Sequence, residues 1–192
     1  MAAPLTLAEG IIAALGRRSA TGAVVDAAGA ARAAVAAADG WGIARALVAA
    51  DDVLEGLGIP AALGADGREV LRWPEGRDRG WRELLGLEGP EPTLGVTVPA
   101  LGVAERGTLV LEAGPGHGRS IDVVSTYHLA VLPASRLRAT LAEALAETYA
   151  GGRAPSAVSL VSAPSRTSDI EKISTLGAHG AKGLHLLVVE DL

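Results

Sequence analysis

The sequence predicts an α/β protein with a mostly parallel sheet, on the basis of three observations. Short apolar runs bounded by Gly, Pro and Ser fill the second half of the chain, and such runs are typical of strands buried on both faces of a sheet. Helical segments alternate with these runs, which favours strand–helix–strand units. The first half is helical in pattern and rich in Ala. We therefore expect a single domain, in which an α-rich N-terminal region at 1–92 packs on an α/β core at 93–192.

Composition excludes several classes of protein. The chain has 192 residues, a net charge of -5 and no cysteine, so disulfides, thiolate nucleophiles and cysteine-ligated clusters are ruled out. The acidic balance, without a basic stripe, argues against nucleic acid as a partner. No run of about 18 apolar residues occurs, and no basic segment precedes an apolar stretch at the N-terminus. We expect a cytoplasmic protein with no membrane span.

The helical half contains three predicted segments. Residues 6–18 read as a helix, with Thr6 and Glu9 as a capping box. The stretch 26–38 is almost entirely Ala and Val, and the high helix propensity of Ala favours a helix there. The pattern of residues 41–57 predicts an amphipathic helix, which Gly56 and Gly58 end. The following stretch, 64–92, reads as loop-rich, with a short helix near 81–87.

The second half contains five predicted strands and two predicted helices. The strands are expected at 94–98, 107–113, 128–133, 157–163 and 184–191. One helix is predicted at 137–150, where leucines recur every four residues, and another at 168–176.

The first candidate loop is Gly114-Pro-Gly-His-Gly-Arg119, which directly follows a predicted strand. A strand followed by glycines is the context of a dinucleotide-binding loop, but the glycine spacing differs from G-x-G-x-x-G. The β-branched residues that come next also lead towards another strand. A tight turn that needs positive φ explains the glycines better. His117 and Arg119 could project from this turn towards a ligand.

The second candidate loop is Ser162-Ala-Pro-Ser-Arg-Thr-Ser-Asp169. Ser168 and Glu171 form a predicted capping box, and the amides of a helix N-terminus, together with hydroxyls and Arg166, suit a phosphate or carboxylate. Such a site would lie at the carboxyl end of a parallel strand, where α/β folds usually bind ligands. The alternative is that Thr167 and Ser168 only cap the helix while Arg166 is solvated. The sequence leaves both interpretations open.

The four histidines do not predict a metal site. They lie in separate elements and lack metal-binding spacing. His128 and His185 fall inside apolar strands, where we expect them to be hydrogen-bonded residues of the sheet. His117 and His179 lie in loops and are better placed to meet a ligand. A Ser-His-acid triad is disfavoured because no G-x-S-x-G motif is present.

Two blocks of sequence resemble the LUD-domain family, and its lactate-utilization protein C branch in particular. The first block is Gly102-Val-Ala-Glu-Arg-Gly-Thr-Leu-Val-Leu-Glu-Ala-Gly-Pro-Gly-His-Gly-Arg119, followed by Tyr127-His128; the second is Ser162-Ala-Pro-Ser-Arg-Thr-Ser-Asp-Ile-Glu171, followed by Gly177-Ala-His-Gly180. The chain departs from the family at Arg106, where the family usually has Thr, and at the alanines Ala163, Ala178 and Ala181.

The resemblance implies a Rossmann-like fold similar to the NagB/RpiA/CoA-transferase-like superfold. It also implies a role in the oxidation of L-lactate to pyruvate, alongside two partner proteins that carry iron–sulfur clusters. The absence of cysteine agrees with this division, because this chain offers no thiolate to a cluster. We therefore predict an accessory component of a lactate-utilization system that binds a small anionic ligand and no cofactor of its own.

The predicted ligand-binding residues come from both loops and their neighbours. They are Thr108, His117, Arg119, Ser165, Arg166, Thr167, Ser168, Asp169 and His179. One alternative is an acyl- or CoA-transferase-like enzyme with Glu105 as the nucleophile, but fold analogy is weak support for chemistry, and a charged residue in a loop that enters a strand is the simpler interpretation of Glu105. Another alternative is a non-catalytic scaffold for the iron–sulfur proteins.

Overall fold

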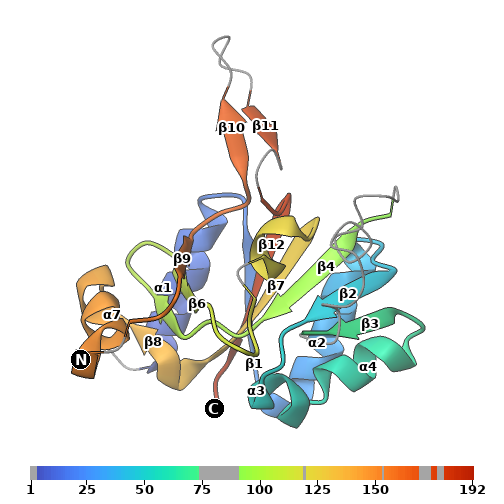
Figure 1. Ribbon diagram of the computed structural model, residues 1–192, viewed down its shortest axis with the longest axis horizontal. Coiled ribbons are helices and arrows are strands. Elements are labelled where there is room, and N and C mark those ends of the chain that lie inside the picture. The colour runs from blue at the N-terminus through green and yellow to red at the C-terminus, as the bar shows by residue number, and fades with distance from the viewer. Residues whose placement is uncertain (1–3, 74–90, 119, 153, 169–173, 177–179) are drawn as a thin grey trace.

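The computed structural model describes residues 4–73, 91–118, 120–152, 154–168, 174–176 and 180–192. Its centre is a six-stranded, entirely parallel sheet in the order β1-β12-β7-β4-β2-β3 (Figure 1). The strands are β1 (Thr21–Val25), β2 (Arg45–Val48), β3 (Glu69–Arg72), β4 (Thr93–Thr97), β7 (Tyr127–Pro133) and β12 (Gly183–Val189). The predicted α/β class with a mostly parallel sheet is therefore confirmed.

One face of the parallel sheet is covered by helices from the first half of the chain. These are α2 (Ala27–Gly40), α3 (Asp52–Gly56) and α4 (Ile59–Ala65). Asp26 caps α2, because its carboxylate accepts a hydrogen bond from the Gly29 amide at 2.7 Å. The buried stripe of Ala30, Ala34 and Ala38 has no bulky side chains, so α2 can approach the sheet closely.

The opposite face is covered by α1 (Pro4–Gly16) and by a second, smaller sheet. Ile11 and Leu15 of α1 pack with Leu132 and Leu186 of the parallel sheet. The smaller sheet has the order β8-β5-β6-β9 and mixes parallel and antiparallel pairs. Its strands are β5 (Leu101–Val103), β6 (Thr108–Glu112), β8 (Leu137–Arg138) and β9 (Val158–Val161). Two helices accompany these strands, α6 (Ile121–Val124) and α7 (Leu141–Thr148).

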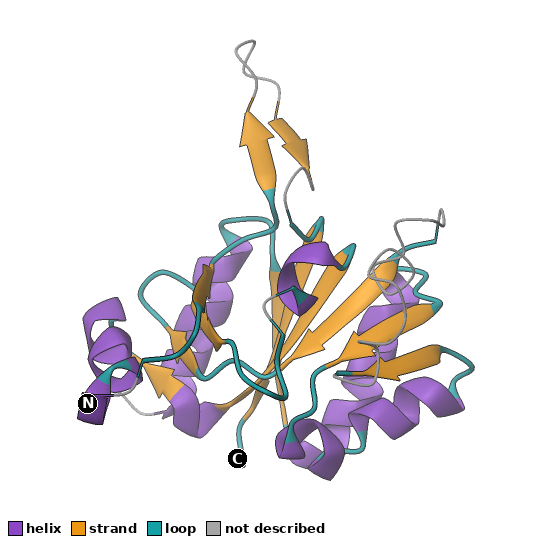
Figure 2. Cartoon of the chain, in the orientation of Figure 1, coloured by secondary structure: helices purple, strands orange, loops and turns teal. Residues whose placement is uncertain are grey.

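A narrow hairpin extends beyond the two sheets. It consists of β10 (Arg166–Ser168) and β11 (Ser174–Leu176), which pair antiparallel. The hairpin rises at the end of the parallel sheet where β7 and β12 begin (Figures 1 and 2). The predicted helix at 168–176 is therefore wrong at both of its ends, because 166–168 and 174–176 are strands that bond each other. Glu171, the second residue of the predicted capping box, lies outside the described residues.

The predicted helix at 41–57 is wrong in its first part, where β2 lies, and only α3 within it is helical. Gly42 adopts a φ of 63°, which favours glycine and ends α2, and the next residues enter β2. Asp51 then starts the short helix α3 by accepting a hydrogen bond from the Val53 amide at 2.9 Å. The region 1–92, predicted to be helical, thus contributes β1, β2 and β3 to the sheet, and β2 pairs directly with β4.

Smaller differences concern element boundaries. The helix predicted at 6–18 begins at Pro4, so Thr6 lies inside it and does not start it. The helix predicted at 137–150 begins at Leu141, after β8, with a capping box formed by Thr140 and Glu143. All five predicted strands are present, but 107–113 and 157–163 lie in the smaller sheet, where β6 and β9 are antiparallel. The segment 81–87 lies outside the described residues.

Candidate functional site

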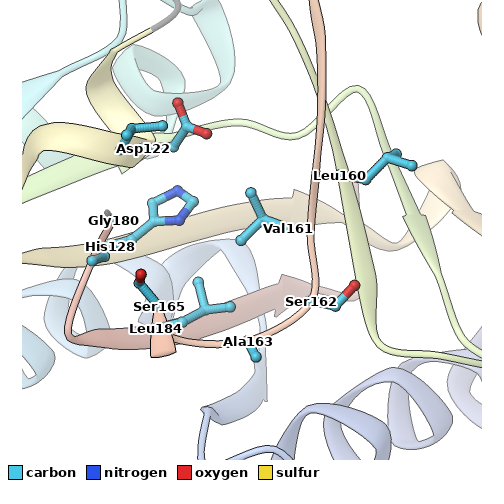
Figure 3. Close-up of a pocket in the computed structure, with 11 residues that line it drawn as sticks. Asp122, His128, Leu160, Val161, Ser162, Ala163, Ser165, Gly180 and Leu184 are labelled. Carbon is cyan, nitrogen blue, oxygen red and sulfur yellow. The ribbon is translucent and has the colours of Figure 1, made fainter. Parts of the chain in front are cut away.

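A cavity of about 190 Å³ lies beside the first residues of β7 and β12, on the face that carries the smaller sheet (Figure 3). Helix α6 borders it on one side, and the end of β9 with the chain that follows borders it on the other. The lining residues are Asp122, Val123, His128, Leu160, Val161, Ser162, Ala163, Ser165, Gly180, Ala181 and Leu184.

Asp122 is the acidic group of this cavity. It lies in the first turn of α6, and the residue is only 5% exposed. Its Oδ2 atom has no hydrogen-bond partner within the described part of the chain. Burial raises the pKa of Asp122 above its usual range, because a charged carboxylate is poorly solvated there.

A glycine in β4 allows α6 to approach the sheet. A Cβ atom on Gly95 would lie 2.4 Å from the carbonyl oxygen of Ile121 and 2.8 Å from the hydroxyl of Ser125. The main chain of α6 therefore occupies the space that a side chain at position 95 would need. This close approach holds Asp122 over the start of β7.

His128 is the second polar group that faces the cavity. It is 1% exposed, and its Nε2 atom lies 2.8 Å from the Thr97 hydroxyl at the end of β4. Its Nδ1 atom has no hydrogen-bond partner among the residues that the structure describes. Burial, reinforced by nearby His117, lowers the pKa of His128 to about 3, so the ring is neutral at physiological pH. His185, in contrast, pairs through Nδ1 with the Thr21 hydroxyl at 2.7 Å.

His117 lies in the glycine-rich loop that follows β6. Its ring hydrogen-bonds the backbone of Glu112, and burial lowers its pKa. Its Nε2 atom is buried, and the described ranges contain no partner for it. His117 interacts electrostatically with His128 but is not a lining residue of the cavity.

The glycines of this loop allow close packing of the main chain, and none of them is needed for a positive φ. None of Gly114, Gly116 and Gly118 has a positive φ, so the predicted tight turn of that kind is wrong. A Cβ atom on Gly116 would lie 2.2 Å from the Ala50 carbonyl oxygen, and one on Gly118 would lie 2.2 Å from the Trp73 ring. The loop is thus seated against the residues that follow β2 and β3, and it leads into α6 instead of a strand.

The structure brings some of the predicted ligand-binding residues to the cavity. Ser165 lines it, and its amide donates to the Ala181 carbonyl at 2.8 Å. Thr108 is buried and does not line the cavity, but its hydroxyl lies 2.8 Å from the hydroxyl of Ser162, which does.

Other predicted residues lie elsewhere. Arg166, Thr167 and Ser168 form β10 immediately after Ser165, so the helix N-terminus predicted at Ser168 is wrong, while a role of these three residues in ligand binding stays a prediction. Arg119, Asp169 and His179 lie outside the described residues. The ligand site of the second candidate loop is predicted at the carboxyl end of a parallel strand, and this is also wrong. The loop follows β9, which runs antiparallel to β6, and the cavity lies where the parallel strands β7 and β12 begin.

Glu105 occupies an exposed turn between β5 and β6. Its Oε1 atom accepts a hydrogen bond from the Leu141 amide at 2.9 Å, at the start of α7. The carboxylate therefore supplements the Thr140 cap of this helix. Glu105 does not line the cavity.

Sequence reasoning missed Asp122. The residue lies in the run Ile121-Asp-Val-Val124, whose β-branched residues predict the approach to a strand. The signal for Asp122 is an acidic residue within an otherwise apolar, β-branched run. Such a run is usually buried, and burying a carboxylate is costly, so a buried acid often has a functional role.

The cavity combines a polar wall with apolar ones. Asp122 and His128 supply hydrogen-bonding atoms, whereas Leu160, Val161 and Leu184 supply apolar surface. Val123 and Leu160 are 44% and 47% exposed, so both reach the surface beside the cavity. Within the described ranges, no group of three His, Cys, Asp or Glu side chains could hold a metal ion. The arrangement is suited to a small organic molecule that has both a polar and an apolar part.

Known proteins similar to this chain point to one family. The family model described as LUD domain matches residues 8–189. The chain is 32% identical over 145 residues to Lactate utilization protein C of Halalkalibacterium halodurans, which covers 73% of this chain and 60% of that protein. It is 33% identical over 149 residues to the uncharacterized protein YkgG of Escherichia coli, covering 73% and 61% of the two chains. The chain thus spans about three-fifths of the length of these relatives.

A solved structure supports the fold. The crystal structure of a DUF162 family protein from Deinococcus radiodurans superposes with a TM-score of 0.70. The match covers 98% of this chain and 99% of that one, at 20% sequence identity. None of the helices described here is both long enough and apolar enough to cross a membrane.

Proposed function

Because the chain belongs to the LUD domain family, we propose that it is an accessory component of a lactate-utilization system and binds a small organic acid of that system. The observation that supports a ligand is the cavity itself, whose lining combines the polar side chains of Asp122 and His128 with an apolar part. Such a lining suits a small molecule that has both a polar and an apolar part. The relatives named Lactate utilization protein C support the choice of acid.

The proposal assigns electron transfer to other chains. With no cysteine, this chain has no thiolate for an iron–sulfur cluster, so the clusters of an L-lactate-oxidising system would belong to its protein partners. The chain itself would contribute the ligand site and a docking surface. A cytoplasmic location and kinship with the NagB/RpiA/CoA-transferase-like superfold are parts of the same proposal.

Growth on lactate tests the proposed function. We expect that deleting this coding sequence from its source organism slows growth on L-lactate as sole carbon source but not on glucose, and that the wild-type gene restores growth. Unchanged growth of the deletion strain on L-lactate would refute the proposal.

Complementation separates a ligand-binding role from a purely scaffolding one. Asp122→Asn should fail to restore growth, whereas Glu190→Gln should restore it, because Glu190 is exposed and follows the far end of β12. Full rescue by Asp122→Asn would favour the scaffold, since the cavity would then be dispensable.

A further inference from the structure

We propose that the edge strand β9 pairs with β9 of a second copy of this chain, antiparallel and centred on Leu160. The smaller sheet would then continue from one protomer into the other. This inference goes beyond the proposed function, because it concerns a contact between two copies of the chain and does not depend on any ligand.

The first argument comes from the hydrogen-bond pattern of β9. This strand ends the order β8-β5-β6-β9, so among the described strands it is bonded to β6 alone. The Ala113 amide donates to the carbonyl of Ala157, the residue opposite it. Bonded and non-bonded pairs alternate along an antiparallel ladder, so Ser159 also bonds β6, whereas the N–H and C=O groups of Val158 and Leu160 point away from it. The structure gives these outward groups no partner within the described part of the chain.

The second argument concerns the side chain of Leu160, which is 47% exposed. In Figure 3 it points to the opposite side of the strand from Val161, which lines the cavity. Val110, its neighbour across the ladder in β6, is fully buried, so the exposure begins at the outermost strand. An open strand edge that carries a large apolar side chain is suited to pairing with another strand.

The other sheet edges in the described residues differ from β9. At one end of the parallel sheet, β3 carries the charged residues Glu69 and Arg72. At the far end of the smaller sheet, β8 is only two residues long and carries Arg138. The remaining edge strand, β1, has no large apolar side chain that is exposed. Charges and short strands keep sheet edges from pairing, so their absence at β9 favours a strand as its partner.

The sequence around β9 points to a second copy as that partner. Residues 154–165 contain no Asp, Glu, Lys or Arg, so two such segments meet without like charges facing each other. A twofold axis at Leu160 places this residue opposite the partner's Leu160, and the same outward groups of both copies are then used. The two residues would exchange both main-chain hydrogen bonds, with their Cα atoms about 5.5 Å apart, and would cover each other's side chains. Pro155 and Pro164 cannot donate to a ladder and limit the paired segment to the residues between them.

Sedimentation velocity over about a hundredfold range of protein concentration tests the inference. We expect the wild-type chain to shift from monomer to dimer as its concentration rises. Leu160→Lys should raise the dissociation constant of the dimer by about tenfold or more, because two ammonium groups would face each other at the axis. Leu192→Lys is the matched control, since it makes the same change at an exposed leucine outside β9 and should dimerise like the wild type.

A mixture of charge variants tests the register. At a concentration where the wild-type chain is dimeric, Leu160→Lys and Leu160→Glu should each be monomeric when alone. Their equimolar mixture should form a heterodimer, because opposite charges then face each other at the axis. A mixture that remains monomeric would overturn pairing about Leu160.

A wild-type chain that stays monomeric at every concentration would overturn the proposal, as would a Leu160→Lys variant that dimerises as tightly as the wild type. Hydrogen exchange of the wild-type chain gives a readout that needs no variant to fold. The outward amide of Leu160 should exchange more slowly where the dimer forms than where the monomer prevails. Equal exchange of this amide in monomer and dimer would place the interface elsewhere and contradict the proposal.

Discussion

Lowering the pH from 7 to 5 should destabilise this protein through His128. The ring is buried and neutral in the folded chain, where burial lowers its pKa from 6.5 to about 3. At pH 5 the histidine is therefore protonated in the unfolded chain and remains neutral in the folded chain. The stabilising contribution of neutral His128 is complete above pH 6.5 and is lost progressively as the pH falls towards 3.

The magnitude follows from these two pKa values. At pH 5 the unfolded histidine is almost fully protonated and the folded one is not, which corresponds to a loss of about 2 kcal/mol. His117 and the half-buried His185 act in the same direction, because burial also lowers their pKa values. Asp122 acts in the opposite direction, since its raised pKa lets the folded chain bind a proton more readily than the unfolded one.

Urea unfolding followed by circular dichroism at pH 7 and pH 5 measures this loss. In His128→Gln the amide can keep a hydrogen bond to Thr97 without titrating, so the loss between the two pH values should shrink by about 2 kcal/mol. His185→Gln is the comparison: that histidine is only partly buried, so its removal should also reduce the loss, but by less than the removal of His128. The reasoning fails if the wild-type protein is equally stable at both pH values, or if His128→Gln loses as much stability as the wild type does.

The remaining predictions concern packing and caps. Gly95→Ala should cost about 1–3 kcal/mol in urea unfolding, because its Cβ would collide with the main chain of α6, whereas Gly40→Ala meets open space and should be neutral or slightly stabilising. Thr97→Val should cost about 1–3 kcal/mol in the same assay by leaving His128 Nε2 unpaired, and unchanged stability would contradict that hydrogen bond. Glu105→Ala should lower the thermal stability by about 1 kcal/mol through its lost bond to Leu141, while lactate binding measured by titration stays the same. Hydroxylamine treatment after incubation with an acyl-CoA should leave Glu105 unmodified in mass spectra, and a modified Glu105 would revive the transferase alternative.

The strands of the second half were predictable because each is a short, continuous apolar run bounded by turn residues. Residues 128–133 and 184–191 consist largely of Leu and Val between turn residues, and burial on both faces of the parallel sheet demands that composition. The segment 41–57 misled, since Ala, Leu and Val at short spacing suit a helix and a buried strand equally well. Only the tertiary pairing of β2 with β3 and β4 decides between them.

The site was predictable only in part, for a similar reason. Ser165, which is predicted as a hydroxyl of the second candidate loop, lines the cavity, and Thr108, which is predicted as its neighbour, hydrogen-bonds the lining residue Ser162. Residues 168–176 carry a sound capping pattern, yet the chain pairs 166–168 with 174–176. Asp122 acquires its significance from the packing of α6 over Gly95, which involves residues 26 to 30 positions apart and leaves no local signature.

The position of β12 in the parallel sheet sets an order for folding during synthesis. β12 lies between β1 and β7, and its residue His185 pairs with Thr21, 164 positions earlier. Until residues 183–189 have been synthesised, β1 lacks its neighbour in the parallel sheet and β7 presents an unpaired edge. Pairing over such a distance is slow, and exposed strand edges invite aggregation. A nascent chain stalled before β12 would therefore depend on chaperones, whereas completion of this one strand joins both parts of the sheet at once.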